Sequence, residues 1–106
     1  MEKRVVITGL GAVTPVGIGK ENFYNALLAG QSGIGPITRF DASDYATRIA
    51  GEVKDFDVTN YCVDKKEARR MDRSVELAIG AAVLACEDAD LDLDKQDLDR
   101  CGTVVG

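Results

Sequence analysis

The chain has 106 residues, of which 45% are apolar and 29% are charged, a composition typical of a globular domain rather than a disordered chain. Thirteen Lys and Arg against eighteen Asp and Glu give a net charge of −5, the wrong sign for a surface that tracks nucleic acid. The sequence contains no histidine, so a Cys–His or Ser–His nucleophile pair, a His-ligated metal and a His general base are excluded within it.

The first third of the chain predicts a buried strand followed by an amphipathic helix. Residues 4–8 form a β-branched run ended by the Gly-Leu-Gly turn at 9–11, which is typical of a strand buried on both faces of a parallel sheet. Pro15 prevents a helix from starting directly after these glycines, so a loop is predicted next. Residues 20–29 then place apolar side chains at helical spacing before a glycine stop, which predicts a helix.

The middle of the chain predicts mostly loop. Residues 31–45 are punctuated by glycine and proline, whereas residues 46–53 alternate weakly and predict an outlying strand. Asp64 is predicted to cap a short cationic helix, with Glu67 at its third position completing an Asp version of the capping box.

The last third predicts a long helix and a closing strand. Asp72 is placed to cap a helix from residue 73 to about residue 89, and Asp94 to cap one further turn. Residues 102–105 form a second β-branched strand. The order of elements predicts an α/β fold, and no repeat or linker marks a domain boundary.

Two features indicate that residues 1–106 are an incomplete portion of a domain. The long helix is apolar nearly all round, as a helix buried on several sides is, and few other elements are available to cover it. Its apolar residues are Val75, Leu77, Ala78, Ile79, Ala81, Ala82, Val83, Leu84, Ala85 and Cys86. The chain also stops on a strand, which would leave an open sheet edge. A partner copy that supplies the cover is the alternative.

Two candidate ligand sites fail on their spacing. A dinucleotide-binding loop needs a third glycine where Thr14 stands, and Pro15 follows it, so a nucleotide-binding fragment is the weakest hypothesis. The acid-rich stretch 88–99 mimics a calcium loop, but Leu93 occupies the position that requires glycine. The sequence therefore predicts no cofactor and no metal.

The three cysteines, Cys62, Cys86 and Cys101, are predicted to be small buried hydrophobic residues. They lie far apart and without CxxC spacing, which supports neither a zinc ribbon nor a disulfide framework. The longest apolar run, 77–86, is too short to cross a bilayer, and the amino-terminal residues lead into a strand rather than a signal sequence. A cytoplasmic protein without a membrane partner is expected.

The predicted interaction site is a basic cluster on and beside the short helix. Its members are Lys65, Lys66, Arg69, Arg70 and Arg73. Lys66, Arg69 and Arg70 lie at i, i+3 and i+4 and share one helix face. No aromatic residues are interleaved for base stacking, so an anionic protein or phosphate-bearing partner fits the cluster, and an ordinary solvated helix explains it as well.

Three segments in the same order resemble the amino-terminal end of the beta-ketoacyl-[acyl-carrier-protein] synthase II family. They are RVVITGLGAVTPVG at 4–17, ALLAGQSGI at 26–34 and KKEARRMD at 65–72, and the resemblance runs on to GTVVG at 102–106. Taken singly, these motifs also suit polyketide ketosynthases, so fatty acid and polyketide synthesis stay open.

The resemblance implies part of the N-terminal half of a thiolase-like five-layered α/β/α/β/α fold that works as a homodimer. The family elongates acyl chains in fatty acid biosynthesis by decarboxylative Claisen condensation of an acyl thioester with malonyl-acyl carrier protein. Its catalytic cysteine and two histidines lie beyond residue 106, so none of Cys62, Cys86 and Cys101 inherits the nucleophile's role. Residues 1–106 alone are expected to be inactive.

For the basic cluster, the resemblance implies docking of acyl carrier protein. In relatives a K-E-x-R-K/R stretch contacts the acidic recognition helix of the carrier protein, and it maps onto Lys66, Arg69 and Arg70. Arg70 stands where lysine is common, which keeps the charge and changes the hydrogen-bond geometry. The alternative is a stand-alone, non-catalytic module that docks an acidic partner through the Lys65–Arg73 helix.

Overall fold

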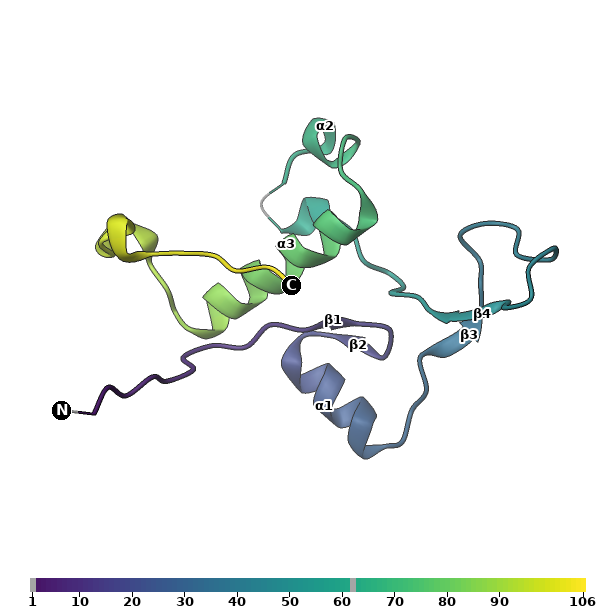
Figure 1. The fold of residues 1–106 in the computed structure, drawn as a ribbon, viewed down its shortest axis with the longest axis horizontal. Coiled ribbons are helices and arrows are strands. Elements are labelled where there is room, and N and C mark those ends of the chain that lie inside the picture. The colour runs from purple at the N-terminus through teal and green to yellow at the C-terminus, as the bar shows by residue number, and fades with distance from the viewer. Residues whose placement is uncertain (1, 62) are drawn as a thin grey trace.

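A computed structural model describes residues 2–61 and 63–106 as an open arrangement of short elements around one long helix (Figure 1). In chain order the elements are β1 (Val13–Thr14), β2 (Gly17–Ile18), α1 (Lys20–Leu28), β3 (Ile34–Pro36), β4 (Ile49–Gly51), η1 (Val58–Asn60), α2 (Lys65–Ala68), α3 (Arg73–Asp88), η2 (Leu93–Lys95) and η3 (Leu98–Arg100). The radius of gyration is 17.0 Å. A compact domain of this length has a radius of about 13 Å, so the elements are loosely gathered.

The predicted helix at 20–29 is confirmed as α1, including its glycine stop. Gly30 adopts a left-handed conformation with φ 68°, which glycine reaches without a steric penalty. The Gln31 amide donates to the Ala26 carbonyl at 3.0 Å and the Gly30 amide to the Leu27 carbonyl at 3.1 Å. These two bonds form a Schellman motif and satisfy carbonyls that the helix end leaves free.

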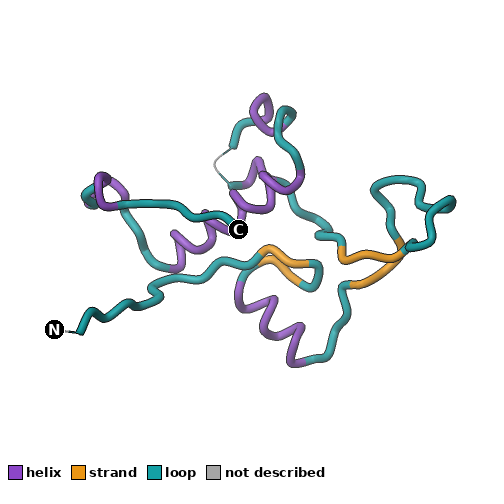
Figure 2. Tube along the Cα trace, viewed as in Figure 1, coloured by secondary structure: helices purple, strands orange, loops and turns teal. Residues whose placement is uncertain are grey.

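Two small antiparallel hairpins form where the sequence mostly predicts loop (Figure 2). The predicted loop after the glycine turn folds back as β1 and β2, and the Thr14 hydroxyl closes it by donating to the Gly17 carbonyl at 2.8 Å. The outlying strand predicted at 46–53 is confirmed as β4, but its partner β3 lies inside the predicted loop 31–45. A three-residue strand that contains glycine and proline leaves no periodic signal in the sequence.

The strands predicted at 4–8 and 102–105 are not formed in this structure. Both segments are extended and exposed, with Val5 at 94% and Val104 at 99% of full exposure. A strand exists only when a neighbouring strand accepts and donates its backbone hydrogen bonds. Within residues 2–61 and 63–106 neither segment has such a neighbour.

The predicted helices on both sides of residue 70 are confirmed as α2 and α3. The Asp64 carboxylate accepts from the Glu67 amide at 2.8 Å, which is the first bond of the predicted capping box. Asp72 occupies the N-cap position of α3, but its carboxylate forms no capping bond. The α3 amino terminus is instead held by the side chain of Arg73, as described below.

The segment after α3 forms two single turns, and the prediction that Asp94 caps one of them is wrong. Asp92 caps η2 by accepting from the Asp94 amide at 3.0 Å, and Asp97 caps η3 by accepting from the Asp99 amide at 3.2 Å. An aspartate two residues before an amide closes such a turn by itself, so the Asp-x-Asp spacing offers several competing caps.

The amino-terminal segment packs closely against the backbone of α3. An added Cβ at Gly9 would collide with the Ala85 carbonyl oxygen, and one at Gly11 with the Ala81 carbonyl oxygen. Because Gly9 and Gly11 have no side chain, their backbone can lie close to the helix. The sequence predicted for them only a tight turn at the end of a strand.

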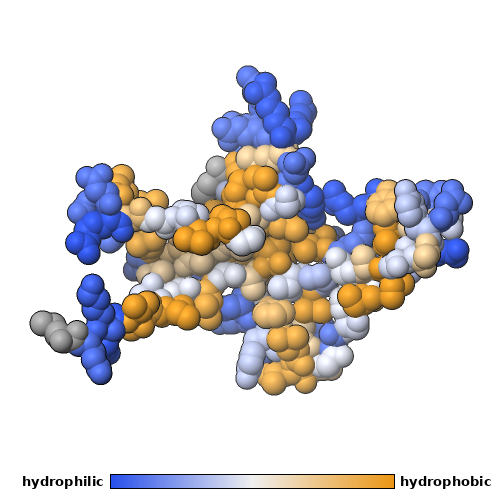
Figure 3. All heavy atoms as spheres, in the orientation of Figure 1, coloured by the Kyte–Doolittle hydropathy of each residue, from blue (hydrophilic) through white to orange (hydrophobic). Residues whose placement is uncertain are grey.

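The apolar surface of α3 is only partly covered. It contacts β1 and η1, and of its sixteen residues, all described, Gly80 alone is buried. The predicted burial on several sides is therefore not achieved here, and apolar side chains lie on the molecular surface (Figure 3). Cys86 and Cys101 are exposed, so their predicted burial is wrong, and Cys62 lies outside the described residues. No described helix is long and apolar enough to cross a membrane.

A hydrogen-bonded carboxylate joins the far end of α3 to two earlier parts of the chain. Asp88 accepts from the Lys20 ammonium at the start of α1 and from the Leu10 amide at 2.9 Å. The Lys20 hydrogen bond, and then the Leu10 amide, hold the pKa of Asp88 below its ordinary value of 3.8. Because the folded state favours the charged carboxylate, the stabilisation is complete above that ordinary value and is lost as the pH falls below it.

We therefore expect Asp88→Asn to be less stable than the wild type at neutral pH, with a difference that shrinks below about pH 4. Urea unfolding at about pH 7 and about pH 3 measures both differences. Asp94→Asn removes an exposed aspartate of the following turn and is the matched control. An equal loss for Asp88→Asn at both pH values would contradict the role assigned to its charge.

Candidate functional site

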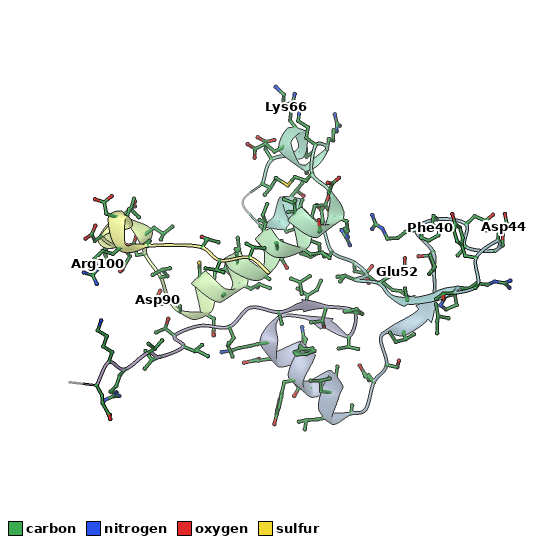
Figure 4. All side chains as sticks on the ribbon, in the orientation of Figure 1. Phe40, Asp44, Glu52, Lys66, Asp90 and Arg100 are labelled. Atoms are coloured by element: carbon green, nitrogen blue, oxygen red, sulfur yellow. The ribbon has the colours of Figure 1, made fainter. Side chains whose placement is uncertain are left out.

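The candidate site is the exposed turn α2, which projects from the rest of the molecule (Figure 1). Lys65 and Lys66 lie on α2 and Arg69 and Arg70 directly follow it, and all four are exposed. The Lys66 side chain points away from the other elements (Figure 4), and hydrophilic atoms cover this projection (Figure 3). The structure thus brings together four of the five residues of the predicted basic cluster.

Local hydrogen bonds form α2 and end it after one turn. Beyond the Asp64 cap, the Ala68 amide donates to the Asp64 carbonyl at 3.0 Å. The Arg70 amide donates to the Glu67 carbonyl at 2.9 Å and the Met71 amide to the Ala68 carbonyl at 3.2 Å, which are the tighter bonds of a closing turn. The basic side chains are therefore grouped on a short, well-capped loop.

The four exposed cations are available to a partner. Among the described residues, the ion pairs involve Lys20, Arg73 and Lys95, and none involves Lys65, Lys66, Arg69 or Arg70. Residues 64–72 hold these four cations and three acidic residues, Asp64, Glu67 and Asp72, so the stretch is net positive on a chain of net charge −5. An isolated patch of this kind attracts an anionic surface and steers its approach.

Arg73, the fifth residue of the predicted cluster, faces inward. Its guanidinium donates to the carbonyls of Val53 at 3.0 Å and Phe56 at 3.2 Å, and pairs with Glu76 at 2.9 Å. Its Cζ also lies 5.2 Å from the centre of the Phe56 ring. The sequence pattern grouped Arg73 with the exposed cations. Glu76, three residues later on the same helix, is the one local signal of an inward ion pair.

Phe56 links the segment before α2 to α3. It is buried, its ring lies 5.2 Å from that of Tyr61 in a stacked arrangement, and it packs against the bare backbone of Gly80. A Cβ at Gly80 would lie 2.5 Å from the ring. Buried Val58 follows in η1, which contacts both α2 and α3. We call residues 56–61 the platform, because they pack against α3 through Phe56 and contact α2 through η1.

The other candidate sites gain no support from the geometry. The acid-rich stretch carries the capped turns η2 and η3, and the described residues hold no group of three or more side chains placed to bind a metal ion. An open hollow of about 550 Å³ lies on the uncovered side of α3, beside the segment that follows it. It is lined by Ala82, Val83, Cys86, Glu87, Asp90, Leu91 and Leu93. This hollow belongs to the uncovered apolar surface, and no residue of the basic cluster lines it.

Comparison with known proteins gives a consistent result across nearly the whole chain. The family model described as "Beta-ketoacyl synthase, N-terminal domain" matches residues 2–106. Proteins named 3-oxoacyl-[acyl-carrier-protein] synthase 2 are similar in sequence. The one from Synechocystis sp. is 50% identical over 105 residues, and that from Vibrio harveyi is 45% identical over 105 residues. The one from Staphylococcus aureus (strain COL) is 46% identical over 104 residues.

These alignments cover 98–99% of this chain but 25% of each relative. The chain therefore spans about a quarter of the length of the curated relatives it matches. A solved structure named "The ishigamide ketosynthase/chain length factor" is similar with a TM-score of 0.73 and 37% sequence identity. That similarity covers 84% of this chain and 22% of the other.

The packing of Phe56 predicts that truncating it destabilises the protein far more than truncating an exposed phenylalanine. We expect Phe56→Ala to lower the free energy of unfolding by about 3–5 kcal/mol, because a buried ring is replaced by a cavity. Phe40, exposed and in edge contact with Tyr45, is the matched control, and Phe40→Ala should cost about 1 kcal/mol. Urea unfolding measures both variants, and similar losses would contradict the platform's role.

Proposed function

Because this chain belongs to the beta-ketoacyl synthase family and matches its N-terminal domain, we propose that it forms part of a condensing enzyme that elongates acyl chains. The observation that carries the proposal is the 45–50% identity, along nearly the whole chain, to enzymes named 3-oxoacyl-[acyl-carrier-protein] synthase 2. A stand-alone binding module is not favoured, since these relatives are named as synthases.

The proposed reaction is decarboxylative Claisen condensation in fatty acid biosynthesis. An acyl group held as a thioester on an enzyme cysteine is attacked at its carbonyl carbon by the carbanion that malonyl-acyl carrier protein forms on losing carbon dioxide. The new carbon–carbon bond lengthens the chain by two carbons, and the cysteine thiolate leaves. The chain has no histidine to assist these steps. We therefore assign the nucleophile and its histidines to parts of the enzyme outside residues 1–106.

The exposed apolar surface supports a larger thiolase-like fold around this chain. Val5, Ile7 and Val104 are exposed in extended segments, as residues of a strand without neighbours would be. Exposed apolar side chains gathered in this way are typical of a surface that contacts other protein. We propose that residues 1–106 are the amino-terminal portion of a synthase domain, within a five-layered α/β/α/β/α fold that works as a homodimer.

The role we assign to this portion is docking of acyl carrier protein through Lys65, Lys66, Arg69 and Arg70. Their exposure and their lack of ion pairs among the described residues support this role. The family resemblance of this basic stretch implies contact with an acidic helix of the carrier protein, and complementary charges of this kind speed association and fix orientation.

We expect the double variant Lys66→Glu, Arg69→Glu to raise the apparent KM for carrier-protein substrates by about tenfold or more, with a smaller effect on kcat. Steady-state kinetics of the enzyme that carries this sequence provide the measurement. Lys95→Glu with Arg100→Glu changes the net charge equally on η2 and η3 and should leave the KM within about twofold. An unchanged KM in the α2 variant would refute docking at this site.

Replacing Cys62, Cys86 and Cys101 together by alanine is expected to leave acyl transfer to the enzyme intact. The proposed nucleophile lies elsewhere, so a radiolabelled acyl thioester should still label each subunit covalently. Mass spectrometry of the labelled peptide locates the bond. Loss of labelling in a folded triple variant would show that one of these cysteines carries the acyl group.

A further inference from the structure

The helix α2 lies in a loop whose two ends are joined by one side chain. Arg73 begins α3, and its two terminal nitrogens donate to the Val53 and Phe56 carbonyls at 3.0 and 3.2 Å. These carbonyls lie 20 and 17 residues earlier in the chain, before α2. Arg73 therefore closes the loop at its base and connects the chain that enters α2 to the helix that leaves it.

The guanidinium is held in place from two further sides. Glu76 accepts from it at 2.9 Å, and the Phe56 ring lies beneath it at 5.2 Å. The side chains of Arg73 and Glu76 are 26% and 19% exposed, so the pair is largely shielded from water. A planar fork with several fixed donors can satisfy two carbonyls, a carboxylate and a ring together, which the compact ammonium of lysine cannot do.

The orientation of α2 depends on such outside support. A helix of four residues has too few internal hydrogen bonds to be stable alone. It contacts η1 of the platform, and the chain that leaves it enters α3 after a short link. Closing the loop at Arg73 removes conformations in which α2 would point elsewhere.

We propose that Arg73 is a positioning residue that orients α2 for docking, and that it is not itself part of the charged docking face. The proposal rests on the proposed function, since orientation of α2 affects turnover only if α2 binds the carrier protein. The four exposed cations would then contact the partner, while Arg73 acts through the two backbone carbonyls that it joins.

The substitution Arg73→Lys separates positioning from charge. The Arg73→Lys variant keeps the positive charge but loses the planar guanidinium with its several donors, whereas Arg73→Gln loses both the charge and the guanidinium. If Arg73 attracted the partner directly, Arg73→Lys would resemble the wild type. If it orients α2, both variants should be impaired alike.

The experiment measures steady-state kinetics and amide hydrogen exchange in the enzyme that carries this sequence. We expect both Arg73 variants to raise the KM for carrier-protein substrates by about three- to tenfold. The kcat for the same acyl and malonyl groups on coenzyme A should stay within about twofold. Amide exchange over residues 63–71 should become faster, while exchange in α1 stays unchanged.

The matched control is Arg48→Lys. Arg48 also donates to a backbone carbonyl, that of Tyr45 at 3.2 Å, but it lies in the loop between β3 and β4. This control should leave both the KM and the exchange of residues 63–71 unchanged. If Arg73→Lys lowers the thermal midpoint, Glu76→Gln offers a milder test, because it removes one support of the guanidinium and should raise the KM in the same direction.

A wild-type KM and wild-type exchange in Arg73→Lys would overturn the proposal. So would an equal loss with carrier-protein and coenzyme A substrates, which would indicate general destabilisation. Faster exchange in Arg73→Lys combined with an unchanged KM in Lys66→Glu, Arg69→Glu would refute docking at α2 while supporting the link between Arg73 and α2. The two proposals thus fail in distinguishable ways.

Discussion

The structure depends on how closely other segments approach the helix α3. Phe56 lies against the bare backbone of Gly80, and Gly9 and Gly11 allow the amino-terminal segment to run along the same helix. A side chain at any of these glycines would push the two partners apart. Gly9, Gly11 and Gly80 therefore allow the amino-terminal segment and Phe56 to pack on α3. Because Phe56 belongs to the platform and the platform contacts α2, this packing also affects the position of α2.

A second consequence concerns the surface that α3 leaves uncovered. Burying a helix that is apolar nearly all round requires partners on several sides. Among the described residues, the amino-terminal segment, β1 and η1 pack against α3 and leave much of it uncovered. The β-branched runs at 4–8 and 102–105 likewise stay exposed. Within the proposed synthase both features have one explanation, because the remaining layers would cover the helix and pair the strands.

The residues of the basic cluster differ in their surroundings, and the two roles we propose for them follow from that difference. Lys65, Lys66, Arg69 and Arg70, on α2 and directly after it, are exposed to solvent. A charge in that setting contributes little to stability and much to the rate and orientation of association with an acidic partner. Arg73 is largely shielded, and there its fork joins backbone carbonyls across a loop. The proposed docking face therefore consists of exposed charges, and Arg73 supports it from the base of the loop without belonging to it.

Local signals in the sequence were enough to predict several elements of this structure. The spacing of apolar residues predicted the helices α1 and α3, and Gly30 predicted where α1 ends. The spacing between Asp64 and Glu67 predicted the cap of α2. Three features became visible in the folded chain alone. The β-branched runs at 4–8 and 102–105 are unpaired among the described residues, Cys86 is exposed, and Arg73 turns inward while Arg70 does not. A capping bond or a helical period involves residues within one or two turns of each other. Strand pairing, burial and the direction of an arginine depend on partners up to many tens of residues away, which no local pattern encodes.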